Sequence, residues 1–325
     1  VTSGCGSTNT ITGLLDAWQD NTPVIFISGQ IKRKETSRNS KTNLRQFGVQ
    51  EADIISIVEP ITKYAVMVNE PEKILYHLEK AVHLALSGRP GPVWIDIPLD
   101  VQGFSPDEKD LIHFIPEEKS INGICGMDKF FEMYQQAKRP IILAGNGVRL
   151  SGAVEDLREF SKSNNIPCVV SYLAVDYFEQ DNLNYVGRLG IKGDRAGNFA
   201  IQNSDLIICL GSRLSVALTG FEYELFGRES KLVVIDIDKD EHEKNTVKID
   251  HFIKADVKEF LKIIADKVQK KEQCEWQEKC IHWKNKWPVS QDNYDTDTVN
   301  MYEFTKALSE LANDNAIVVS DAGSS

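Results

Sequence analysis

The fold of this 325-residue chain is decided by the segment PIILAGNGV at residues 140–148. Its first five residues form a continuous apolar run, which is typical of a parallel strand covered on both faces. A glycine-containing turn follows, and Val154, Leu157 and Phe160 then recur at helical spacing. Ser151 is the expected N-cap of that helix. The segment therefore predicts a strand, a tight turn and a helix, in that order.

The same alternation of strand and helix signals runs through most of the chain. One helix is expected to open at Pro71 and to close before Gly88, and another to start at the capping pair Asp256 and Glu259. The apolar runs that predict strands lie at residues 23–28, 93–97, 140–144, 167–171, 205–210, 231–236 and 316–320. Repeated strand–helix units predict an α/β chain with doubly wound, mostly parallel sheets.

Two polar interruptions predict the domain boundaries. The second of them holds a short amphipathic helix with Trp276, Trp283 and Trp287 on one side. Such tryptophans could stack on nucleic-acid bases, but at helical spacing we expect them to pack a connector onto a domain. The predicted parts are a first domain at 1–103, a linker at 104–122, a central Rossmann-like domain at 123–270, a connector at 271–298 and the start of a third domain at 299–325.

The composition predicts a cytoplasmic protein without nucleic-acid or membrane partners. A net charge of −11 argues against a nucleic-acid binder, which normally carries a basic field. Every apolar run is far shorter than the roughly 18 residues that span a bilayer. The chain opens without a basic, apolar leader. The six cysteines lack paired metal-site spacing, so we expect them to be reduced thiols.

Five short motifs in the first domain are weak singly and specific together. Each has a structural explanation when taken alone; the last, for example, is a rigid turn that leads into a buried strand. They are TSGCGSTN at 2–9, SGQ at 28–30, QEAD at 50–53, PITK at 60–63 and GRPGPVWIDIPLDV at 88–101. Their order resembles the pyrimidine-binding domain of the acetolactate synthase family of thiamine-diphosphate enzymes, with its TSGPGATN, TGQ, FQE, PITK and GRPGPVxIDIPxDV.

The resemblance continues through the central domain, in GNGV at 145–148, GIKG at 190–193, GSR at 211–213 and DID at 236–238. In acetolactate synthases this domain carries FAD, and the resemblance assigns that contact to Gly145, Gly147, Arg213 and Asp236. An acidic residue at a strand end can bond ribose hydroxyls. Of the family's GARFDDR stretch only the first arginine is kept, so FAD stays open beside an empty domain or an ADP-like ligand.

The resemblance implies an enzyme that uses thiamine diphosphate and Mg²⁺ to decarboxylate a 2-keto acid. The cofactor serves as the electron sink, and the product then adds to a second carbonyl or is protonated. Family active sites lie between subunits, which implies a homo-oligomer, either a dimer or a tetramer. The resemblance places Gly4 and Asn9 on the pyrimidine side of the cofactor, Gln50 facing the reacting centre, and Lys63 near the channel.

At the other end of the chain, Asp321 and Gly323 match the turn that opens the family's diphosphate-binding domain. The family's activating glutamate and its Gly-Asp-Gly metal motif do not occur within these 325 residues, so no metal ligand is assigned to them. We therefore expect the chain to be an incomplete piece of such an enzyme, inactive by itself.

Three departures from the family pattern bear on the substrate. Cys5 replaces a proline, and Val49 replaces a phenylalanine whose loss would widen the acceptor pocket. The basic loop 31–46 is longer than usual, and it suits a phosphorylated or nucleotide-bearing acceptor or is simply solvated. Two other classes stay open: a non-catalytic binding piece, and a dinucleotide-dependent oxidoreductase, which would need a third glycine where Leu150 stands.

Overall fold

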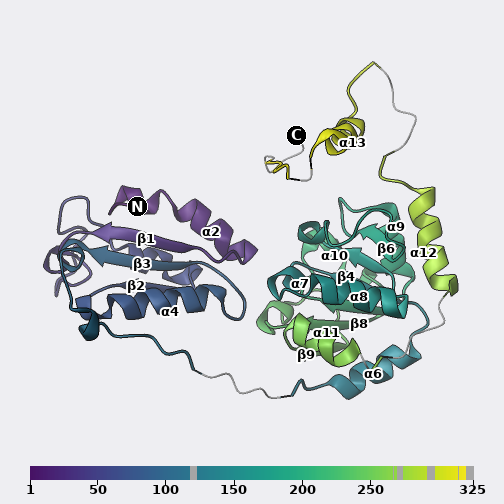
Figure 1. Ribbon diagram of the computed structural model, residues 1–325, viewed down its shortest axis with the longest axis horizontal. Coiled ribbons are helices and arrows are strands. Elements are labelled where there is room, and N and C mark those ends of the chain that lie inside the picture. The colour runs from purple at the N-terminus through teal and green to yellow at the C-terminus, as the bar shows by residue number, and fades with distance from the viewer. Residues whose placement is uncertain (118–122, 266, 269–273, 291–296, 314, 320–325) are drawn as a thin grey trace. The chain divides into compact units, whose positions relative to one another are not determined.

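The structure is a computed structural model that describes residues 1–117, 123–265, 267–268, 274–290, 297–313 and 315–319. The chain forms two compact units, unit 1 at Val1–Gly123 and unit 2 at Ile124–Ser325 (Figure 1). Each unit is built around its own parallel sheet, so each is described by itself.

Unit 1 holds a three-stranded parallel sheet in the order β1-β3-β2. The strands are β1 (Ile25–Gln30), β2 (Tyr64–Met67) and β3 (Val93–Pro98). The helices are α1 (Cys5–Thr8), α2 (Ile11–Asp20), α3 (Ile54–Val58), α4 (Ile74–Leu86) and α5 (Leu99–Gln102). Single 3-10 turns lie at η1 (Arg33–Glu35), η2 (Glu59–Ile61), η3 (Pro71–Lys73) and η4 (Glu108–Asp110).

The central strand β3 packs a different helix layer on each face, because successive side chains of a strand point in opposite directions. Trp94 lies against Leu14 of α2 and the apolar residues of α3. Val93 and Ile95 lie against Ala81 and Ala85 of α4 on the other face. This double covering holds the carboxyl ends of the strands in fixed positions, and the loops that follow them build the candidate site.

Unit 2 holds a six-stranded parallel sheet in the order β6-β5-β4-β7-β8-β9. Its strands are β4 (Pro140–Ala144), β5 (Cys168–Val170), β6 (Tyr185–Arg188), β7 (Leu206–Leu210), β8 (Lys231–Asp236) and β9 (His251–Lys254). The first strand of this sheet lies inside it and the order reverses between β4 and β7, which is the doubly wound Rossmann arrangement with its topological switch point.

Two apolar layers cover the sheet of unit 2. One contains α6 (Met127–Gln136), α8 (Val154–Asn164) and α11 (Val257–Ala265), and the other α9 (Arg195–Asn203) and α12 (Cys274–Lys286) (Figure 1). The remaining helices are α7 (Gly147–Leu150), α10 (Val216–Thr219) and α13 (Met301–Leu311), with 3-10 turns η5 (Tyr172–Ala174), η6 (Tyr223–Leu225) and η7 (Asp240–His242). Within the described part of the chain, every helix is too short or too polar to cross a membrane.

The α/β fold of parallel sheets is confirmed, and so are six of the seven expected strands. The expectation for 316–320 is wrong over its described residues 316–319, which make no strand pairing. Ser151 was expected to cap α8 but ends α7 instead, where its hydroxyl donates to the Val148 carbonyl. The connector tryptophans pack as predicted: Trp276 is buried in unit 2 and donates to the Pro140 carbonyl.

Candidate active site

A cavity of about 860 Å³ opens in unit 1 where the loop after β1 meets the N-terminal turn. We call it the Gly4 pocket. It is lined by Thr2, Ser3, Gly4, Cys5, Gly6, Thr8, Gln46, Phe47, Gly48, Val49, Gln50, Glu51 and Ala52. Two motifs far apart in the sequence, TSGCGSTN and QEAD, therefore share one cavity.

Gly4 and Gln50 touch through their backbones at the centre of this lining. Both residues lie in the left-handed region, with φ of 61° at Gly4 and 56° at Gln50. A Cβ added at Gly4 would lie 2.1 Å from the Gln50 carbonyl oxygen, so no other residue fits there without moving the loop. A glutamine with positive φ is uncommon and is held in place by its surroundings.

The first of these surroundings is a buried polar network between β1 and β3. The carboxylate of Asp96, 1% exposed, accepts hydrogen bonds from Ser28 Oγ at 2.5 Å and from Gln30 Nε2 at 3.0 Å. Gln30 Nε2 also donates to the Ala52 carbonyl at 3.0 Å, while Trp94 Nε1 donates to Ser28 Oγ. The network thus ties the wall of the Gly4 pocket to the sheet.

Burial raises the pKa of Asp96 from its ordinary 3.8 to about 6, although the Ser28 and Gln30 hydrogen bonds act in the opposite direction. Desolvation of the charged form outweighs those bonds because the carboxyl group lies inside the sheet, away from water. This buried acid therefore titrates much closer to neutrality than an ordinary surface aspartate.

The second support is Glu51, whose side chain is buried at 5% exposure. One carboxylate oxygen accepts from the Ser37 backbone N–H at 2.9 Å and from Ser37 Oγ at 2.5 Å. The other accepts from the Phe47 backbone N–H at 2.9 Å. The loop between β1 and α3 is thus folded around one carboxylate, and the helix itself starts later, with Asp53 as its N-cap.

The structure places Asn9 and Lys63 elsewhere in unit 1. Asn9 is exposed at the end of α1, and it is absent from the described lining of the Gly4 pocket. Lys63 precedes β2, so it lies at the amino end of the sheet, where Lys63 Nζ donates to the Ser87 carbonyl at 2.6 Å. The sheet thus separates Lys63 from Gln50, and Asp321 and Gly323 fall outside the described residues.

In unit 2, the predicted glycines meet at the switch point between β4 and β7. A Cβ at Gly145 would lie 2.3 Å from the Gly211 carbonyl oxygen, and one at Gly147 would lie 2.6 Å from Gly211 Cα. The Gly147 N–H also donates to the Gly211 carbonyl at 2.9 Å. These glycines allow two turns of the chain to cross in contact with each other.

The two polar residues predicted beside these glycines, Arg213 and Asp236, contact residues at positions 238–242. Arg213 Nε lies 3.3 Å from a carboxylate oxygen of Glu241. One oxygen of Asp236 accepts from the Asp238 N–H at 2.9 Å, and the other lies 3.3 Å from His242 Nε2. The structure therefore gives partners within unit 2 to Gly145, Gly147, Arg213 and Asp236.

Sequence reasoning missed Asp96 and Glu51 as supports of the site. The signal available for Asp96 is a lone acid inside the apolar run VWIDIP, because a charged residue in a doubly covered strand needs buried partners. Glu51 offered no such signal, since its neighbours in the sequence are mostly exposed or half-buried.

Comparison with known proteins identifies the class to which these two sheets and the Gly4 pocket belong. Residues 1–56 match the N-terminal TPP binding domain of thiamine pyrophosphate enzymes, and residues 127–264 match their central domain. The chain therefore carries two of the domains that build thiamine pyrophosphate enzymes, and over nearly its whole length it is similar to acetolactate synthase large subunits.

The relatives within that class include several acetolactate synthase large subunits. The chain is 32% identical to a probable acetolactate synthase large subunit of Methanocaldococcus jannaschii, over 99% of this chain and 55% of the relative. It is 31% identical to the large subunit of Corynebacterium glutamicum, over 99% and 51%, and 30% identical to that of isozyme 2 of Escherichia coli, over 99% and 56%. The chain thus spans about half the length of these relatives.

Proposed function

We propose that this chain provides the pyrimidine-side wall of an enzyme that decarboxylates a 2-keto acid and transfers the product to a second carbonyl compound. The observation that carries the proposal is the contact between Gly4 and the Gln50 carbonyl in a cavity at the carboxyl end of a parallel sheet. Ligands of open α/β sheets bind at that end. The cavity is also large enough for a small-molecule ligand.

In this proposal Gly4 lets the backbone approach the cofactor ring, and the exposed Gln50 amide hydrogen-bonds substrate oxygens. Bound thiamine diphosphate supplies the electron sink that loss of carbon dioxide requires. We assign Asn9 and Lys63 supporting places at α1 and at the turn before β3, respectively. Asp321 and Gly323 are assigned to the diphosphate side, with Mg²⁺ held by ligands other than those of unit 1.

The proposal extends to the assembly and the domains of the whole protein. A cofactor held between subunits requires a homo-oligomer, a dimer or a tetramer, and the acidic composition suits a cytoplasmic enzyme. We propose that the domain division predicted from the sequence holds, with one addition. The described part of the connector, α12, belongs to the core of unit 2 because Trp276 and Cys280 are buried there.

The direct test is titration of the full-length protein with thiamine diphosphate in the presence of Mg²⁺, followed by measurement of carbon dioxide released from pyruvate and other 2-keto acids. We expect saturable binding to the full-length protein and none to the 325-residue chain alone, with release of carbon dioxide only by the former. Binding without release from any 2-keto acid would favour the non-catalytic alternative. A full-length protein that does not bind the cofactor would refute the proposal.

FAD is a separate question, because the four residues expected to contact it have partners within unit 2. We propose that unit 2 carries no bound flavin. A visible absorbance scan of the purified full-length protein tests this, and a flavin spectrum that survives gel filtration would contradict it. The same scan weighs against an oxidoreductase role if no flavin or bound nicotinamide is released on denaturation.

A further inference from the structure

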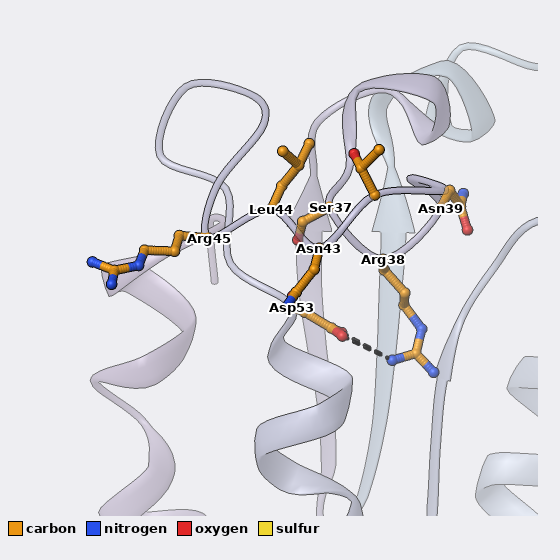
Figure 2. Close-up of a pocket in the computed structure, with 8 residues that line it drawn as sticks. Ser37, Arg38, Asn39, Asn43, Leu44, Arg45 and Asp53 are labelled. Carbon is orange, nitrogen blue, oxygen red and sulfur yellow. Dashed lines mark hydrogen bonds and ion pairs between the residues drawn. The ribbon is translucent and has the colours of Figure 1, made fainter.

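A second cavity in unit 1 lies within the long loop between β1 and α3 (Figure 2). We call it the loop pocket; its volume is about 540 Å³. It is lined by Ser37, Arg38, Asn39, Thr42, Asn43, Leu44, Arg45 and Asp53. Every lining side chain except Leu44 is polar or charged, so the cavity suits a hydrophilic ligand with several hydrogen-bonding groups.

The loop around this cavity is strongly basic in an otherwise acidic protein. Residues 31–46 contain three lysines, three arginines and a single acidic residue, whereas the chain carries a net charge of −11. Two of the arginines are neutralised: Arg33 pairs with Asp100 at 2.8 Å and Arg38 with Asp53 at 2.9 Å. Within the described part of the chain, the exposed cations Lys32, Lys34, Lys41 and Arg45 have no carboxylate in ion-pair contact.

Figure 2 shows how these charges are arranged at the loop pocket. Arg38 reaches Asp53, whereas the Arg45 side chain extends away from that pair. The amide of Asn43 and the hydroxyl of Thr42 come from the same segment as Arg45. Cations beside amide and hydroxyl donors are the groups that recognise a phosphoryl oxygen.

The loop pocket and the Gly4 pocket share a wall. Gln50, Glu51 and Ala52 line the Gly4 pocket, and the next residue, Asp53, lines the loop pocket. Ser37 lines the loop pocket and also donates to the Glu51 carboxylate. The 50–53 segment thus contributes to both cavities, which places the loop pocket next to the end of the Gly4 pocket that Gln50 lines.

We propose that the loop pocket binds the phosphoryl-bearing part of the acceptor substrate, as in a sugar phosphate or a nucleotide-linked sugar. The inference rests on the proposed function, because it assigns the acceptor of that reaction. Arg45, which lines the pocket, supplies the positive charge, and Lys41, which lies outside the lining but next to Thr42 in the chain, adds to it. Thr42 and Asn43 donate hydrogen bonds to the phosphoryl or sugar oxygens. Arg38 contributes less, because Asp53 already neutralises it.

The test is calorimetric titration of the full-length protein with glucose 1-phosphate, uridine diphosphate and, as the uncharged reference, glucose. We expect at least one phosphorylated probe to bind about tenfold more tightly than glucose, with affinity that falls as salt is raised. Comparison of the two phosphorylated probes distinguishes a sugar phosphate from a nucleotide. Equal affinity for all three probes would overturn the proposal.

The double variant Lys41→Gln/Arg45→Gln should remove most of this preference, leaving less than about a threefold difference from glucose. Its matched control is Lys254→Gln/Lys262→Gln, which removes the same charge from exposed positions of unit 2. The control should keep the full preference. If both double variants lose it equally, the preference comes from overall charge and the loop pocket is not the site.

Asp53→Asn provides a gain-of-affinity test that misfolding cannot imitate. Asparagine can still cap α3, because its side-chain oxygen accepts from Ser56, but it no longer neutralises Arg38. We expect phosphorylated probes to bind roughly threefold to tenfold more tightly to this variant. Unchanged or weaker binding would contradict the charge assignment.

Release of carbon dioxide from the 2-keto acid donor, measured with no acceptor present, separates the two proposals. Release without preference for phosphorylated probes removes the acceptor inference and leaves the proposed function intact. A preference for phosphorylated probes without release from any donor removes the proposed reaction, and with it the acceptor role of the loop pocket.

Discussion

The two units use glycine-containing turns for different purposes. In unit 1, Gly4 meets the Gln50 backbone in the lining of an open cavity. In unit 2, Gly145 and Gly147 pack directly against Gly211, so that two backbone turns contact each other at the switch point. The cavity of unit 1 is kept open because the buried carboxylates of Glu51 and Asp96 hold its loops. Glycine motifs alone therefore do not locate a site; the groups that fix the surrounding backbone do.

The largest change in stability is expected from a substitution at Gly145. A methyl group there would lie 2.3 Å from the Gly211 carbonyl oxygen and 2.5 Å from Ser212 Cα, and neither backbone atom can move freely. We expect Gly145→Ala to lower the free energy of unfolding of unit 2 by roughly 3–5 kcal/mol, measured by chemical denaturation.

Gly13→Ala is the matched control for that substitution. Gly13 lies within α2 with open space around it, so alanine should stabilise unit 1 by about 0.5–1 kcal/mol. If Gly145→Ala unfolds like the unsubstituted protein, the turns of unit 2 are open and the contrast between the units fails.

The next largest effect concerns pH and Asp96. The folded protein holds this proton more tightly than the unfolded chain, because its pKa is raised from 3.8 to about 6. The stabilisation from protonated Asp96 is therefore complete below pH 3.8 and is lost as the pH rises through about 6. By linkage it is on the order of 3 kcal/mol.

Asp96→Asn should remove this pH-dependent contribution from the free energy of unfolding, whereas the exposed control Asp16→Asn should retain it. Unfolding curves at several pH values between 3.5 and 7, about the range set by the two pKa values, measure the difference. Identical pH profiles for Asp96→Asn and the unsubstituted protein would show that the pKa of Asp96 is not raised in the folded protein.

A smaller effect is expected at Glu51. Glutamine at this position presents an amide N–H₂ to one of the donors, Ser37 or Phe47, so one buried hydrogen bond is replaced by a repulsive contact. We expect Glu51→Gln to destabilise unit 1 by about 2 kcal/mol and to speed amide exchange in the loop. Glu35→Gln, in the same loop, removes the same charge and should change stability by less than about 0.5 kcal/mol.

The last comparison is between two glycines that share a positive φ. Gly4 and Gly88 have φ of 61° and 60°, but only at Gly4 would a Cβ meet another atom within 4 Å. Gly88→Ala should destabilise unit 1 by about 1 kcal/mol through backbone strain alone, whereas Gly4→Ala should cost more because its methyl group would also meet the Gln50 carbonyl oxygen. Gly4→Ala should in addition weaken thiamine diphosphate binding to the full-length protein by about tenfold. If Gly4→Ala and Gly88→Ala bind thiamine diphosphate equally well, Gly4 does not contact the cofactor.

The sequence predicts the buried strands well and the short edge strands poorly. β4, β7 and β8 are continuous apolar runs, and their burial on both faces is what that pattern implies. β2, β6 and β9 were missed because each is an edge strand only four residues long, so it is defined by pairing with its neighbour. The apolar residues 316–319 show the reverse case, because apolarity without a paired neighbour does not make a strand.

The candidate site could be predicted only in part. The motifs predicted Gly4 and Gln50 for the cofactor and substrate site, and both residues line one cavity. The sequence could not show that Lys63 lies at the other end of the sheet, since its position depends on where β2 begins. Nor could it show that Arg213 and Asp236 would have partners of their own, because Glu241 and His242 reach them only after the η7 turn has formed.

The burial of Trp276 has a practical consequence for preparing unit 2 in isolation. The segment matched by the central-domain family ends at residue 264, yet Trp276 and Cys280 complete one of the two apolar layers, and Trp276 Nε1 bonds the first residue of β4. A recombinant fragment that stops at the family boundary would present an uncovered apolar face to solvent and should aggregate, whereas one that continues beyond Lys286 should remain monodisperse.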